Sequence, residues 1–145
     1  MSSLSPMTSE QNKARVIEAW QVFKTRDPQR IAALFTEDAE WLAPPDNATA
    51  VALGGSHRIV GRVLITQFLA TEMYRIFRDI QIEFRGVHAD GNTVIVEERM
   101  RATVPNGARY DNDYCFLFEL ADGRIRRVRE YMDTQRAKQM ILGGA

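Results

Sequence analysis

Three turn dipeptides divide the second half of this chain into strand-length runs, and they limit the possible folds more than any other feature. The dipeptides are Asp90-Gly91, Asn106-Gly107 and Asp122-Gly123, which are typical of tight β-hairpin turns. The runs beside them have the composition of strands: Thr93–Val104, Arg109–Leu120 and Arg124–Met132. An earlier run, Ile80–Phe84, alternates apolar and polar side chains. The pattern predicts an antiparallel meander of four strands.

The first half of the chain has the period of helices instead. Thr8-Ser9-Glu10-Gln11 has the form of a capping box, and apolar residues then recur at helical spacing to about Arg26. Asp27-Pro28 is typical of a second helix start, with Pro in the first turn. We expect further helices over residues 61–75 and 134–142.

Two segments lie between these helices. Residues 39–43 have the composition of a short strand. The 15 residues from Pro44 to Arg58 are interpreted as a long loop, and a loop of this length in a small domain favours a lid or a pocket rim. Helices followed by a meander predict an α+β domain with the helices on one sheet face. We expect one domain over residues 1–145, with residues 1–7 as a disordered leader.

Composition excludes several classes of protein. Lys and Arg total 19, as do Asp and Glu, and this balance argues against a nucleic-acid-binding protein. Cys115 is the only cysteine, so neither an internal disulfide nor a zinc site is expected. The chain has no apolar run long enough to span a membrane and no signal-peptide pattern, so the cytoplasm is the expected compartment.

A family resemblance is carried mainly by the C-terminal half. Its motifs are Tyr110-Asp111-Asn112-Asp113-Tyr114, Phe116-Leu117-Phe118, Asp122-Gly123-Arg124-Ile125 and Arg129-Glu130-Tyr131-Met132-Asp133-Thr134. Together with residues 26–39, they resemble the SnoaL-like, ketosteroid-isomerase-related proteins of the nuclear-transport-factor-two-like superfamily. The resemblance implies a cystatin-like, cone-shaped fold in which a curved antiparallel sheet wraps around helices and encloses a pocket. It indicates the fold more specifically than the function, because this superfamily contains both enzymes and binding proteins.

The resemblance also implies which side chains face the pocket. If the register of the limonene-epoxide-hydrolase-like members holds, the inward residues are Ile95, Glu97, Arg99 and Arg101, then Asn112, Tyr114, Phe116 and Phe118, and then Val128, Glu130 and Met132. Alternation along a strand places each set on one face without indicating which face is inside. Glu130 and Arg99 are the catalytic candidates, as a proton-abstracting base and an oxyanion-stabilising cation.

Known reactions of the superfamily fit this sequence unequally. Arg101 stands where the epoxide hydrolases have their second acid, and a guanidinium is a poor proton donor, so epoxide hydrolysis is not expected. Ala43 replaces the general base of ketosteroid isomerase. The acid in the last strand of the SnoaL-type polyketide cyclases has a counterpart in Glu130.

The remaining candidates are assigned to ligand binding. They are Arg101, Asn112, Tyr114, Trp41, Phe116, Met132, Met73 and His57. We expect a small hydrophobic ligand with a carbonyl or carboxylate group, converted by acid–base chemistry without a cofactor or metal. Two alternatives stay open: a binding protein without catalysis, and a protein-interaction module that uses the open sheet face. A homodimer through that face is expected.

Overall fold

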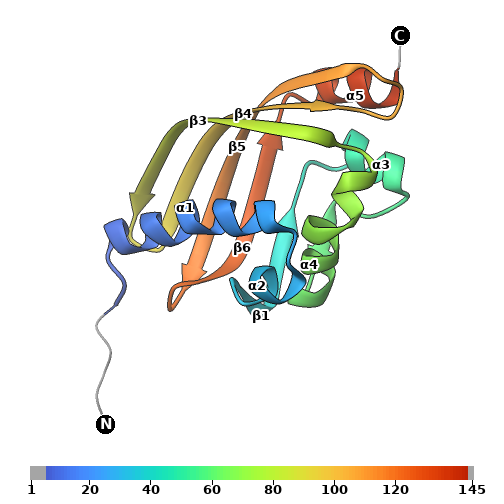
Figure 1. Cartoon of the computed structure of the whole chain (residues 1–145). Coiled ribbons are helices and arrows are strands. Elements are labelled where there is room, and N and C mark those ends of the chain that lie inside the picture. The colour runs from blue at the N-terminus through green and yellow to red at the C-terminus, as the bar shows by residue number, and fades with distance from the viewer. Residues whose placement is uncertain (1–5, 144–145) are drawn as a thin grey trace.

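The computed structural model describes residues 6–143 as one curved sheet with helices against its inner face (Figure 1). The helices are α1 (Ser9–Thr25), α2 (Pro28–Ala32), α3 (Ala48–Leu53), α4 (Arg62–Ala70), the 3-10 helix η1 (Glu72–Arg75) and α5 (Thr134–Leu142). The strands are β1 (Phe35–Leu42), β2 (Arg58–Val60), β3 (Arg78–Asp90), β4 (Thr93–Thr103), β5 (Arg109–Ala121) and β6 (Arg124–Met132). The α+β prediction is confirmed. Residues 1–5 of the predicted leader lie outside the described residues.

The sheet has six strands in the order β2-β1-β6-β5-β4-β3. Strands β3 to β6 form the predicted antiparallel meander. The first strand is longer than predicted and pairs parallel with β6, while β2 adds an antiparallel strand outside it. The sheet is therefore wider than the predicted four-stranded meander and short strand, because β2 adds a sixth strand.

The segment from Pro44 to Arg58 is not the continuous loop that was predicted. It contains α3, which begins after Asn47, whose side chain accepts a hydrogen bond from the Ala50 backbone N–H. Gly54 ends this helix in a left-handed conformation that glycine adopts without strain. The predicted third helix is likewise divided, because α4 ends at Ala70 and η1 follows.

Helix α1 packs across the inner sheet face against β3 and β4, and α4 packs against β1 and β2 (Figure 1). Its Trp20 packs edge-on against Phe23, Phe116 and Phe118, with ring centroids 5.3, 5.1 and 6.0 Å apart. The predicted capping box at Thr8 is present and fixes the start of this helix. No helix among residues 6–143 is both long and apolar enough to cross a membrane.

Candidate active site

A cavity of about 920 Å³ lies between the helices and the inner face of the sheet. Five residues predicted for ligand binding line it: Trp41, Met73, Tyr114, Phe116 and His57. Its wall is mostly aromatic and aliphatic, and two acidic side chains, Glu98 and Glu130, reach it from the sheet. The roles of these residues toward a ligand stay predictions, but the cavity brings them together.

Glu130 enters the cavity from β6 and has one hydrogen-bond donor. Trp41 lies on the neighbouring strand β1 and donates from its indole Nε1 to Glu130 Oε1 at 2.9 Å. Enclosure by protein raises the pKa of Glu130 to about 7, against the lowering effect of the Trp41 hydrogen bond. Near neutral pH this carboxyl is thus divided between its two protonation states, as a general base requires.

Glu98 enters the same cavity from β4 and is only 1% exposed. Its Oε2 is enclosed and has no hydrogen-bond partner within residues 6–143. Burial, and to a smaller extent the nearby charge of Glu130, raises its pKa to about 8. A carboxyl without a partner in an apolar wall is more stable in the neutral form, so Glu98 keeps its proton at neutral pH.

The two carboxyls therefore differ in their ease of ionisation. Glu130 ionises first because the Trp41 N–H stabilises its anion, and that charge then opposes the ionisation of Glu98. Between these two steps the cavity contains one carboxylate and one carboxylic acid. An acid and a base held together in an apolar site are the groups that proton-transfer chemistry needs.

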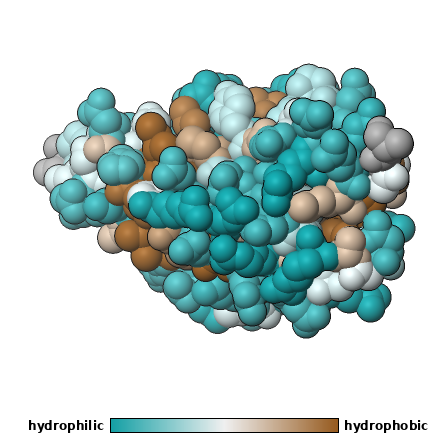
Figure 2. Space-filling model, turned by 90° about the horizontal axis from the view of Figure 1, so that it is seen from above, coloured by the Kyte–Doolittle hydropathy of each residue, from teal (hydrophilic) through white to brown (hydrophobic). Residues whose placement is uncertain are grey.

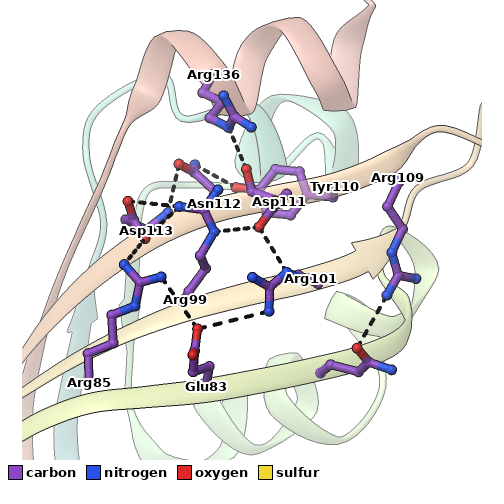
Figure 3. A network of polar contacts seen from close by, with 11 residues as sticks. Glu83, Arg85, Arg99, Arg101, Arg109, Tyr110, Asp111, Asn112, Asp113 and Arg136 are labelled. Carbon is purple, nitrogen blue, oxygen red and sulfur yellow. Dashed lines mark hydrogen bonds and ion pairs between the residues drawn. The ribbon is translucent and has the colours of Figure 1, made fainter.

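Arg99 and Arg101 do not face this cavity, and the predicted Arg99–Glu130 centre is wrong. Both arginines lie on the outer face of the sheet, in a network with acidic groups of β3 and β5 (Figure 3). Arg99 donates to Asp111 at 2.6 Å and to Asp113 at 3.2 Å. The hydrogen bond with Asp111 raises the pKa of Arg99 and lowers that of Asp111.

Arg101 is shared between two acids of the same network. Its Nε lies 3.5 Å from Asp111, and its terminal nitrogen lies 3.9 Å from Glu83 (Figure 3). Ile95 and Glu97, predicted to point inward with these arginines, are exposed on the outer face. The whole inward set of β4 is thus displaced by one residue.

The turn between β4 and β5 accounts for this displacement. Val104 donates to the Ala108 carbonyl at 3.1 Å, so the loop contains three residues, Pro105 to Gly107. Gly107 has a φ of 84°, as in a three-residue hairpin loop that ends on a left-handed glycine. A two-residue Asn106-Gly107 turn would place Arg99 opposite Tyr114. The additional loop residue places Glu98 there instead, and a one-residue slip exchanges the two faces of a strand.

Sequence reasoning missed Glu98, although a signal for it was present. Along β4 the residues that share its face are apolar: Val94, Val96, Met100 and Ala102. The other face carries Glu97, Arg99 and Arg101, which are usually solvated. The apolar alternation of this strand therefore indicated the inward face more directly than the family register did.

Asn112 faces inward as predicted but lies behind the cavity wall. It is 1% exposed, and it donates to the Tyr110 hydroxyl at 2.9 Å and to the Asp133 carbonyl at 3.0 Å. The Tyr110 and Tyr114 hydroxyls are 2.6 Å apart, and only Tyr114 lines the cavity. Asn112 thus supports the position of Tyr114, while the half-buried Met132 is not part of the cavity lining.

The curved sheet and its helices give this chain the fold of solved structures described as NTF2-like. The family model of the SnoaL-like domain matches residues 14–128, most of the chain. The chain therefore belongs to the SnoaL-like domain family, and the resemblance deduced from its motifs is confirmed. A search of curated proteins found no match.

Several solved structures are similar to this chain. One, classed as a SnoaL-like polyketide cyclase from Jannaschia sp. CCS1, has 18% identity and a TM-score of 0.77, with all of both chains covered. An LEH-like epoxide hydrolase from M. tuberculosis has 20% identity and a TM-score of 0.70, covering 94% of this chain and 92% of its own. TerC, co-crystallised with polyporic acid, has 22% identity and a TM-score of 0.76, covering 91% and 98%. At these identities the likeness establishes the fold alone.

Proposed function

We propose that this protein is an acid–base enzyme that moves a proton next to the carbonyl group of a small hydrophobic molecule. The observation that carries the proposal is the pair Glu98 and Glu130, one buried and one half-buried carboxyl, both with raised pKa values in one apolar cavity. Structural ion pairs also shift pKa values, but neither of these carboxyls has a cationic partner within the described residues. The apolar surroundings of the two carboxyls therefore support a role in proton transfer to and from a ligand, and not a role as partners in structural ion pairs.

Each carboxyl has a distinct part in the proposed reaction. The Glu130 carboxylate removes a proton from the carbon next to the carbonyl, and the electrons of that C–H bond move toward the oxygen. The protonated Glu98 donates a hydrogen bond to the oxygen as its negative charge develops. Return of a proton from Glu130 to carbon completes an isomerisation or an exchange. In a cyclase the enolate carbon would instead attack a second carbonyl carbon of the same molecule, and the oxygen of that carbonyl would take up the proton held by Glu130.

The experiment that tests this function measures proton exchange, because the natural substrate is unidentified. 2-Tetralone, a bicyclic ketone small enough for a cavity of about 920 Å³, is incubated with the protein in D₂O. We expect deuterium to appear at the carbon next to the carbonyl faster than in buffer alone, as followed by mass spectrometry. Saturable binding of the ketone without faster exchange would favour the alternative of a binding protein without catalysis.

The exchange rate is expected to depend on pH with a maximum. Glu130 acts ionised, so the rate rises as the pH passes about 7, and Glu98 acts protonated, so the rate falls above about 8. The rise and the fall of the rate report apparent pKa values of the two carboxyls together, because the carboxyls interact. The measurement is kcat/KM for 2-tetralone exchange from pH 5 to pH 9.5, and a rate that rises monotonically through this range would contradict the assignment of Glu98 as the acid.

Epoxide opening is a second candidate function, because the pair Glu98 and Glu130 removes the reason for which the sequence argued against this reaction. That objection was the lack of a proton donor at Arg101, and Glu98 now supplies one from the same strand. Glu130 would activate water while Glu98 protonates the leaving oxygen. Styrene oxide is a suitable probe, and diol formation without ketone exchange would favour this chemistry over the first.

We also propose that the outer sheet face joins two copies of the chain. The face carries the exposed apolar side chains Ile95 and Tyr131, with Leu117 and Cys115 between them. Ion-pair networks lie to either side, around Asp111 and around Glu119. In Figure 2, which shows the molecule from above the view of Figure 1, hydrophilic groups predominate and hydrophobic groups gather in separate patches.

The Tyr131→Glu substitution is expected to dissociate this dimer, because a charge would be buried against the second copy. Sedimentation equilibrium should give the mass of two chains for the unmodified protein and of one chain for the variant. Ile17→Glu, at an exposed position of α1, is the matched control and should remain dimeric. A monomer at every concentration of the unmodified protein would instead favour an interaction module with a different partner.

A further inference from the structure

The rim of the cavity carries positive charge that the proposed proton transfer does not use. Lys24 and Arg26, at the C-terminal end of α1, both line the cavity. Neither forms an ion pair within residues 6–143. The other charged groups of the rim are already neutralised, since Arg58 pairs with Glu40 and Glu72 with Arg75, each at 2.9 Å.

The Arg26 guanidinium is held in a fixed position. Its Nε donates to the Ala70 carbonyl at 3.0 Å, and its central carbon lies 3.8 Å from the centre of the Tyr74 ring. Its backbone ends α1 in a left-handed conformation. These contacts leave the two terminal nitrogens of the guanidinium available as a planar pair of donors, the arrangement that binds a carboxylate with two hydrogen bonds.

We infer that Lys24 and Arg26 form a subsite for a carboxylate on the ligand. The ligand class is then an amphipathic keto acid, with its apolar body in the aromatic cavity and its carboxylate at the rim. Its carbonyl end would reach Glu98, which keeps its proton at neutral pH, and Glu130, which is then partly ionised. The inference extends the proposed function, and it assigns the carboxylate to different cations from Arg99 and Arg101, which face outward.

The test compares two ligands of nearly equal size that differ in charge. 2-Naphthylacetate and 2-naphthylacetamide are titrated into the protein by calorimetry at pH 6.5. The acid should bind about tenfold more tightly than the amide, the gain expected of one charge-assisted contact. Lys24→Gln and Arg26→Gln should each remove part of that tenfold preference for the acid, and the two substitutions together should remove all of it, while the affinity for the amide stays unchanged.

The matched control is Arg30→Gln, an exposed cation on α2 that does not line the cavity. Equal affinity of the unmodified protein for acid and amide would overturn the inference, as would an equal loss for both ligands in the two variants. Lys24→Gln removes a solvent-exposed side chain and keeps the test valid if Arg26→Gln does not fold. Titration needs no turnover, so a protein that prefers the acid but does not exchange 2-tetralone refutes the proposed function and leaves the subsite supported.

Discussion

The Glu130→Gln variant is expected to exchange the 2-tetralone proton about a thousandfold more slowly than the unmodified protein, which is the usual contribution of a positioned general base. The amide keeps the shape of the side chain and can still accept the Trp41 hydrogen bond of 2.9 Å, but it has no basic oxygen. The loss should therefore appear in kcat and not in the affinity for the ketone. Mass spectrometry of the deuterated product gives the rate, and calorimetry gives the affinity.

Arg99→Gln is the control for this prediction, because Arg99 was the predicted partner of Glu130 and lies on the opposite sheet face. It should exchange 2-tetralone at the rate of the unmodified protein. If Arg99→Gln were as slow as Glu130→Gln, the outward register of β4 would be wrong. If Glu130→Gln retained full activity, Glu130 would not be the base.

The architecture was predictable because its signals are local. Three turn dipeptides, alternation along the strands, and a capping box at Thr8 each determine the conformation of a few neighbouring residues, and the structure contains the elements they indicate. The parallel pairing of β1 with β6 and the short strand β2 were missed. Both depend on contacts between segments far apart in the sequence, for which no local pattern gives evidence.

The candidate site was predictable only in part, because a shift of one residue in the register of a strand moves each of its side chains to the opposite face of the sheet. Glu130, Tyr114 and Phe116 were assigned to the inner face, where they lie. Glu98 and Arg99 are adjacent in the sequence, and the length of one hairpin loop decides which of them enters the cavity. The left-handed Gly107 gives this loop three residues, whereas Asn-Gly usually indicates two. The raised pKa of Glu98 follows from that difference.

Burial of Glu98 in its neutral form has a consequence for stability that does not depend on any substrate. Its pKa is about 8 in the folded protein and near the ordinary value of 4.5 in the unfolded chain. Between these values the unfolded state has released the proton and the folded state retains it, so the free energy of unfolding falls as pH rises. Below pH 4.5 both states are protonated, and the full stability is present.

Glu98→Gln removes this proton equilibrium, and the variant should gain stability relative to the unmodified protein as pH rises from 4.5 to 8. The relative gain across that range is on the order of 4 kcal/mol, from the shift in pKa at 1.36 kcal/mol per unit. Any cost of burying the amide is independent of pH, so the difference between pH 4.5 and pH 8 is the quantity to measure, by urea unfolding at both. The control is Glu97→Gln, the adjacent acid on the outer face. The absence of a pH-dependent gain for Glu98→Gln would mean that Glu98 is ionised in the folded protein and is not the proton donor of this site, and an equal gain for Glu97→Gln would mean that the gain does not arise from the burial of Glu98.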